Sequence, residues 1–266
     1  MLKQIDLSII TINYNNLSGL TKTMESVLSQ KARNFEHIVV DGLSTDGSKN
    51  YLESFKKPTF IFISEKDDGI YFAQNKGIEK ARGKYVLFLN SGDTLASANT
   101  IDEIFSYRFE SDLIYGNMFI ESSSNIQRLG KQPKKLTLTH LMLDTIWHPS
   151  CLIRRDLFKR FGLYDTNFKI VADYEFWLRI FSSNQITTTY IPIPFSKFDL
   201  KGLSSDPENQ SFISYERRIS QAMYYNRFDL FFYRDIPLIS RFMFRLIKAL
   251  LRKTLNPIFI RKVRER

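Results

Sequence analysis

Carboxylate and amide side chains follow four apolar runs of the chain within a few residues. The residues are Asn13, Asn15, Asn16, Asp41, Asp67, Asp68, Asn90 and Asp93. Neither Gly-x-Gly-x-x-Gly nor Gly-x-x-x-x-Gly-Lys-Ser/Thr follows the first run, so the usual glycine-rich phosphate anchors are absent. A divalent cation held by carboxylates is then the obvious way to neutralise a diphosphate bound at these positions.

The apolar runs themselves predict the elements that position these side chains. Residues 7–12, 35–40, 60–63 and 85–89 are short β-branched or aromatic stretches typical of buried strands. Helical patterns lie between them: one that Ser18 can cap, one beginning at Asp46 or Ser48, and one over 71–81. Four strand–helix units predict an α/β fold with a mostly parallel sheet covered by helices on both faces. Such sheets bind ligands beyond the carboxyl ends of their strands, although loops there are commonly polar in any case.

Composition excludes several classes of protein. The chain has 266 residues, 43% of them hydrophobic, which argues against a mainly disordered chain. Its single cysteine, Cys151, excludes a disulfide scaffold and a multi-cysteine zinc site, and we expect it to be a core residue.

The net charge of +10 is concentrated at the end of the chain. Residues 236–266 hold nine basic residues against Glu265, so this segment carries +8 of the total. On a helix, four basic residues of this segment would lie along one face: Arg241, Arg245, Lys248 and Arg252. Apolar residues would lie on the opposite face. We expect an amphipathic helical segment that lies on an anionic membrane surface. Packing on the body with a solvated basic face, or nucleic-acid binding, are the alternatives.

Two regions follow from this division, a body over 1–205 and a helical, basic region over 206–266. The first residues lack a signal-peptide pattern and run directly into the first strand. We therefore expect the body to be cytoplasmic and peripheral on the inner face of a bacterial cytoplasmic membrane.

Several motifs in order resemble family 2 glycosyltransferases of the GT-A fold. The stretches that carry the resemblance are Ser8–Asn16, Val39–Ser48, Ser64–Tyr71, Asn75–Ile78, Phe88–Asp93, His148–Ser150 and Ala172–Glu175. Each motif alone is weak, but their order over roughly residues 5–205 is specific. The resemblance extends to the subgroup that builds bacterial surface polysaccharides.

The resemblance implies a site for a UDP-sugar donor. Asp41 would bind the uracil N–H, although it could instead cap the following turn. Thr11, Asn13 and Tyr14 would belong to the same pocket. Further donor contacts are expected from Asp67, Lys76, Asn90 and Ser91, and Lys76 could equally be an exposed helix lysine.

The resemblance also implies a metal site at Asp93, for Mg²⁺ or Mn²⁺. This chain has Asn90 and Gly92 where many relatives have Asp, which implies a weaker site. Asp93 could alternatively cap a helix before Leu95.

On the acceptor side, the resemblance makes Asp173 the catalytic base that removes the hydroxyl proton. Asp173 opens a predicted helix, so an N-cap role is the alternative, and Glu175 is the second choice of base. His148 and Trp147 would contact the acceptor or the diphosphate, or else serve in packing. Residues 201–205 resemble a segment that orders over the donor, and a plain linker is the alternative.

The combined prediction is an inverting transferase. It would move a hexose or N-acetylhexosamine from a UDP-sugar to a saccharide on a lipid diphosphate such as a polyprenyl diphosphate, in O-antigen or capsule synthesis. A sugar nucleotidyltransferase would carry a glycine- and lysine/arginine-rich loop after the first strand, where this chain has Asn13–Asn16. A non-catalytic sugar-nucleotide or nucleic-acid binding module is the alternative from another class, and the near-neutral body argues against nucleic acid.

Overall fold

The computed structural model describes residues 5–32, 34–121 and 127–236, together with residues 243, 246 and 247. The strands are β1 (Leu7–Asn13), β2 (Phe35–Asp41), β3 (Phe60–Ser64), β4 (Tyr85–Phe88), β5 (Thr94–Leu95), β6 (Leu113–Glu121), β7 (Gln127–Gly130), β8 (Cys151–Arg154) and β9 (Thr188–Asp199). The helices are α1 (Leu17–Leu28), α2 (Ser48–Glu53), α3 (Ile70–Lys80), α4 (Thr100–Ser106), α5 (Leu138–Leu143), α6 (Asp156–Phe161), α7 (Ala172–Ser182), α8 (Gln210–Tyr224) and α9 (Arg227–Leu230). Short turns of helix are η1 (His148–Ser150), η2 (Pro207–Asn209) and η3 (Phe231–Asp235).

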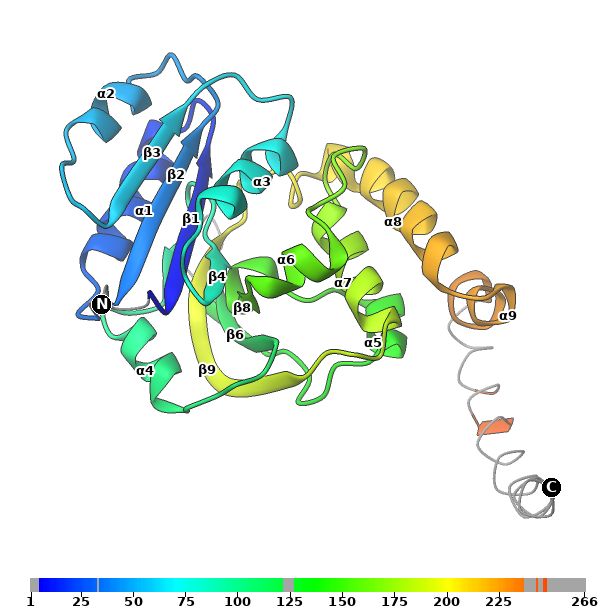
Figure 1. The fold of residues 1–266 in the computed structure, drawn as a ribbon. Coiled ribbons are helices and arrows are strands. Elements are labelled where there is room, and N and C mark those ends of the chain that lie inside the picture. The colour runs from blue at the N-terminus through cyan, green and yellow to red at the C-terminus, as the bar shows by residue number, and fades with distance from the viewer. Residues whose placement is uncertain (1–4, 33, 122–126, 237–242, 244–245, 248–266) are drawn as a thin grey trace.

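These strands form one curved sheet in the order β3-β2-β1-β4-β8-β6-β9-β5, with β7 paired to β6. From β3 to β4 the neighbours are parallel, as the sequence predicts. Beyond β4 the sheet is mixed, because β8 is antiparallel to both β4 and β6 while β9 runs parallel to β6. The long β9 curves under the domain and ends near the parallel strands (Figure 1). The predicted α/β fold with helices on both faces is confirmed.

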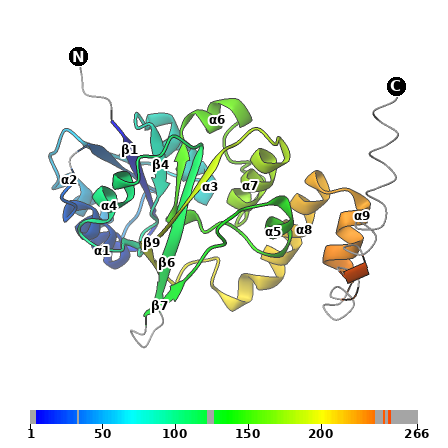
Figure 2. The ribbon, with the colours of Figure 1, turned by 90° about the horizontal axis from the view of Figure 1, so that it is seen from below.

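Helices cover both faces because successive side chains of a strand point to opposite sides. Ile10 and Phe88 pack with residues of α3, α6 and α7 on one face. Ile9 and Leu87 pack with residues of α1 and α4 on the other. Figure 2 shows α1 and α4 on the opposite side of the strands from α6 and α7.

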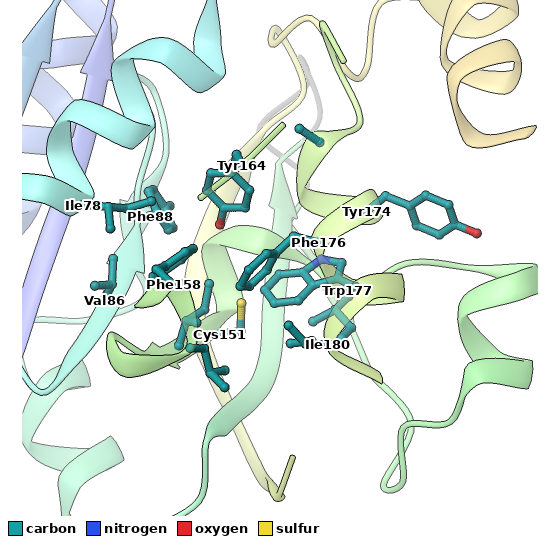
Figure 3. Packing of buried hydrophobic residues seen from close by; sticks show 14 of the residues in the cluster. Ile78, Val86, Phe88, Cys151, Phe158, Tyr164, Tyr174, Phe176, Trp177 and Ile180 are labelled. Carbon is teal, nitrogen blue, oxygen red and sulfur yellow. The ribbon is translucent and has the colours of Figure 1, made fainter. Parts of the chain in front are cut away.

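An aromatic cluster fastens α7 to the sheet (Figure 3). The Phe176 and Phe158 rings stack with centroids 4.9 Å apart, and Trp177 is fully buried beside them. Cys151 is buried in the same cluster, as expected, and its burial raises the pKa of the thiol well above the usual value. Because buried aromatic side chains each stabilise a fold by about 1.5–3 kcal/mol, this cluster holds the start of α7 firmly.

The helix after β1 is capped two residues before Ser18, the predicted cap. Asn16 is its N-cap, and the Asn16 side chain accepts a hydrogen bond from the main-chain N–H of Gly19 at 3.1 Å. Asp46 accepts hydrogen bonds from the main-chain N–H groups of Leu17 and Ser48. One carboxylate therefore joins the starts of α1 and α2.

The helix α8 packs directly on α7. Gln221 donates a hydrogen bond to the Tyr174 hydroxyl at 2.9 Å, and the Arg217 guanidinium lies 4.4 Å from the centre of the Tyr174 ring. No helix in the described part of the chain is both long and apolar enough to cross a membrane. The predicted amphipathic segment over 236–266 lies outside the described residues, except for residues 236, 243, 246 and 247.

Candidate active site

A cavity of about 380 Å³ lies where the segments after β1, β4 and β9 meet the start of α7. Predicted site residues that line it are Asn90, Ser91, Asp93, Trp147, His148 and Asp173. The structure therefore brings the predicted metal ligand and the predicted base to one cavity. A second group lies at the ends of β1 to β3 and comprises Asn13, Tyr14, Asp41 and Asp67, with Lys76 of α3 paired to Asp67.

Asn13 connects the two groups. Its side-chain N–H₂ donates to Asp41 Oδ1 at 2.9 Å, and its Oδ1 accepts from the Ser91 hydroxyl at 2.6 Å. This contact follows from the register, which places Asn13 opposite Asp41 at the ends of β1 and β2.

Asp41 is fully buried, and it holds the loop after β2. Besides Asn13, it accepts hydrogen bonds from the Ser44 main-chain N–H at 3.0 Å, the Ser44 hydroxyl at 2.5 Å and the Ser64 hydroxyl at 2.9 Å. A carboxylate has about four acceptor positions, so all are used. The capping role considered for Asp41 is therefore present, and a base N–H would have to displace one of these donors.

Thr11 does not line this cavity, contrary to prediction. Its side chain is fully buried and lies 2.9 Å from Nε2 of His37 within the sheet. Burial lowers the pKa of His37 to about 3, so this pair is neutral. Thr11 shares a strand face with the apolar Ile9, and it is a structural residue.

Tyr14 and Asp67 both lie next to Gly42. A Cβ on Gly42 would stand 3.2 Å from Cδ2 of Tyr14 and 3.7 Å from Oδ2 of Asp67. Tyr14 is 71% exposed, whereas the Asp67 side chain is 8% exposed. Lys76 forms ion pairs with Asp67 and with Glu65, and these outweigh the lowering effect of burial and raise the pKa of Lys76.

One oxygen of Asp67 is conspicuous. Lys76 binds Oδ1, but Oδ2 is buried and has no hydrogen-bond partner among the described residues. Burial of an unpaired carboxylate oxygen is unfavourable, so a ligand N–H delivered there would be bound favourably.

Asp93 is buried in the loop after β4, and its Oδ1 accepts a hydrogen bond from the main-chain N–H of Asp199 at 3.0 Å. Burial, reinforced by the Asp199 carboxylate, raises the pKa of Asp93 to about 7. The following residues form β5, so the alternative of a helix cap before Leu95 is wrong.

Carboxylate, amide and hydroxyl oxygens at one cavity match the ligands that Mg²⁺ and Mn²⁺ prefer. Asp93, Asn90 and Ser91 present these groups. Among the described residues no group of three or more His, Cys, Asp or Glu side chains could hold a metal ion. The residues thus fit a cation that takes its remaining ligands from the donor phosphates and water.

Asp173 is the second residue of α7, whose N-cap is Val171, so the N-cap alternative for Asp173 is wrong. The hydroxyl of Tyr71 lies 2.9 Å from Asp173 Oδ1 and 2.6 Å from the Ile170 carbonyl oxygen. Burial and the Asp173 charge raise the pKa of Tyr71 well above its usual value, so Tyr71 remains a donor. Tyr71 was overlooked at the sequence level, although it belongs to one of the recognised motifs.

Glu175 is unsuitable as a base. It is buried, paired with Arg179 one turn later, and hydrogen-bonded to the Tyr224 hydroxyl. On a helix, residues two apart point in nearly opposite directions, which is why Asp173 faces the cavity and Glu175 does not.

His148 and Trp147 line the cavity, and both side chains also pack against neighbouring residues of the fold. His148 Nε2 lies 2.8 Å from the Tyr164 hydroxyl, and the His148 ring stacks on Phe88 at 4.4 Å. Burial lowers the pKa of His148 to about 4, so the ring is neutral near pH 7. Trp147 packs against Gly130, where an added Cβ would stand 2.6 Å from the indole ring.

The fold is α/β with one mixed sheet, and polar and acidic side chains lie at the ends of its parallel strands. They face Asp173, an acidic residue on a separate helix. This is the arrangement of a GT-A glycosyltransferase. Residues 8–162 match the family described as Glycosyl transferase family 2, and the chain belongs to this family.

Related proteins agree with this assignment, and a solved structure agrees with the fold. A PGL/p-HBAD biosynthesis glycosyltransferase of Mycobacterium bovis (strain BCG / Pasteur 1173P2) is 29% identical, over 77% of this chain and 82% of that protein. An uncharacterized glycosyltransferase of Mycobacterium tuberculosis is 31% identical, over 80% and 82% respectively. The S. aureus TarS fragment 1–349 with UDP-GlcNAc superposes with a TM-score of 0.63 at 18% identity, over 81% of this chain and 66% of that fragment. This last likeness concerns the fold.

Proposed function

We propose that this chain is an inverting glycosyltransferase that uses a UDP-sugar and a saccharide acceptor carried on a lipid diphosphate. The sugar would be a hexose or N-acetylhexosamine, and the product a bacterial surface polysaccharide. The observation that carries the proposal is one cavity lined by both Asp93 and Asp173. The chain is also similar to a putative teichuronic acid biosynthesis glycosyltransferase of Bacillus subtilis, which supports a surface glycan as the product.

In the transfer, the acceptor oxygen forms a bond to the anomeric carbon while the bond from that carbon to the diphosphate breaks. The leaving UDP takes the bonding electrons, and Asp173 takes the acceptor hydroxyl proton. Tyr71 donates to Asp173 Oδ1, which aims the other oxygen of the carboxylate. A bound Mg²⁺ or Mn²⁺ on Asp93 would stabilise the charge of the leaving diphosphate.

For the donor base, we assign the acceptor role to Asp67 in place of Asp41. Within the described part of the chain Oδ2 of Asp67 has no hydrogen-bond partner, whereas Asp41 already accepts four hydrogen bonds. The uracil imide N–H would satisfy Asp67, and the exposed ring of Tyr14 beside Gly42 would stack on the base.

The acceptor-side proposal is tested by Asp173→Asn. This variant should bind UDP-sugar as the parent does, measured by calorimetry, and lose transfer by roughly 100-fold or more. Asp156→Asn is the matched control, because Asp156 is also an acid in the first turn of a helix but is exposed and outside the cavity. Full transfer by Asp173→Asn would remove Asp173 from the role of base.

We further propose that residues 236–266 hold the enzyme on an anionic membrane. Support comes from the +8 charge of this segment and from apolar side chains on α8 that are exposed at helical spacing. These side chains are Phe212, Tyr215, Ile219 and Met223. Replacing Arg241, Arg245, Lys248 and Arg252 by Gln in the full chain should reduce sedimentation with anionic liposomes and leave neutral liposomes unaffected. Unchanged sedimentation would refute the anchor.

A further inference from the structure

The loop after β4 supplies few carboxylates to its end of the cavity. Asp93 is the only acid in Asn90–Asp93, and Gly92 has no side chain. Gly92 also has φ of +108°, a conformation that L side chains rarely adopt. A hard divalent cation is bound more tightly when several protein carboxylates surround it.

Asp199, the last residue of β9, places a carboxylate at this position. Its Oδ2 lies 3.1 Å from where a Cβ on Gly92 would stand, and its main-chain N–H donates to Asp93. The space over Gly92 is thus occupied by the carboxylate of Asp199.

The orientation of Asp199 leaves one oxygen available. The main-chain N–H of Lys201 donates to Oδ1 at 3.0 Å, and among the described residues Oδ2 receives no hydrogen bond. Both Asp93 and Asp199 line the cavity that contains Asp173. Two acids on separate segments, 106 positions apart in sequence, therefore converge at the same place.

We propose that Asp199 is a second protein ligand of the divalent cation and shares that cation with Asp93. The inference rests on the proposed metal dependence of the transfer. The cation would relieve the repulsion between two carboxylates that the fold holds together. Because residues 201–205 line the same cavity directly after Asp199, the cation would also join the end of β9 to the loop after β4.

Manganese binding by the full-length protein tests this, with free Mn²⁺ followed by electron paramagnetic resonance in the presence of UDP. Loss of an outer-sphere partner alone typically costs 10- to 100-fold in metal affinity. We therefore expect Asp199→Asn to weaken Mn²⁺ binding by at least about tenfold, and Asp93→Asn to do likewise. Glu208→Gln, which removes a charge from the exposed turn η2 nearby, should bind Mn²⁺ as the parent does.

A change of ligand chemistry distinguishes a ligand from a residue that only shapes the loop. Asp199→Cys should lose affinity for Mn²⁺ and gain affinity for Cd²⁺, because thiolates prefer soft metals. Unchanged Mn²⁺ affinity in Asp199→Asn, with no gain of Cd²⁺ binding in Asp199→Cys, would overturn the assignment and leave the glycosyltransferase proposal standing. Transfer that persists in EDTA, with no Mn²⁺ bound by the parent, would overturn the metal site itself. Absence of transfer from any UDP-sugar, with Mn²⁺ binding lost in Asp199→Asn, would count against the proposed function alone.

Discussion

Glu216 on α8 makes the contact whose removal should most affect the base. Its side chain is 4% exposed and accepts hydrogen bonds from three successive main-chain N–H groups. The N–H groups are those of Lys169 at 2.6 Å, Ile170 at 3.0 Å and Val171 at 3.2 Å. These residues lead directly into α7, two positions before Asp173. We expect Glu216 to fix the start of α7 and hence the position of the base.

The size of the effect follows from these contacts. A hydrogen bond to a charged group contributes about 1.5–3 kcal/mol, and buried N–H groups left unpaired add a desolvation cost. Glu216→Gln keeps one carbonyl oxygen but turns an N–H₂ group toward the N–H donors. We expect it to lower the free energy of unfolding by about 2–3 kcal/mol, or the melting temperature by about 5–10 °C for a chain of this size.

Urea unfolding measures the free energy of unfolding, and steady-state kinetics measure kcat and KM. In Glu216→Gln, kcat should fall by about tenfold or more while KM for the UDP-sugar changes little, because the hydrogen bonds of Glu216 go to residues 169–171, directly before the helix that carries the base. Glu216→Asp should restore part of kcat, and Glu208→Gln on the exposed η2 should match the parent in both assays. An unchanged kcat in a clearly destabilised Glu216→Gln would show that Glu216 stabilises the fold without positioning Asp173.

Three further outcomes are expected. Tyr71→Phe should lower kcat by about tenfold at unchanged donor affinity, because it removes the hydroxyl that contacts Asp173 Oδ1 and the Ile170 carbonyl oxygen. Asp67→Asn should weaken UDP binding by roughly tenfold in calorimetry, since the ion pair with Lys76 and the charged acceptor are both removed. The free energy of unfolding should fall as pH drops from about 6.5 to about 4, because unfolded histidine binds a proton in this window and folded His148, with its pKa lowered to about 4, does not. Buried His37, whose pKa is lowered to about 3, contributes to the same slope, so His148→Gln should reduce the slope by about half in urea titrations at several pH values.

The parallel half of the sheet could be predicted because its strands and helices alternate with clear periodicity. The mixed half could not, since β6, β8 and β9 pair across long stretches of chain. Register explains why Asn13 meets Asp41 at two adjacent parallel strand ends. By contrast, nothing local indicates that Asp199 ends beside Asp93, because that depends on the path of a strand 12 residues long.

Two errors at the site had signals in the sequence. Thr11 follows Ile9 on the same strand face, so its burial could be expected from alternation alone. Glu175 lies two residues after Asp173 on a helix, so both could not face the cavity. The hydrogen bonds that occupy Asp41 are different, because they come from loop geometry that no periodicity describes.

One helix, α3, connects the parts of the site that must act together. Tyr71 at its start binds Asp173, and Lys76 five residues later binds Asp67. Between them Gln74 donates to Asn90 Oδ1 at 3.4 Å, on the loop that also carries Asp93. A rigid helix keeps such contacts at fixed separations, which loops of the same length would not do. Since transfer needs the acceptor oxygen and the anomeric carbon within a narrow range of distance and angle, positioning both sides of the cavity from one helix favours the reactive geometry.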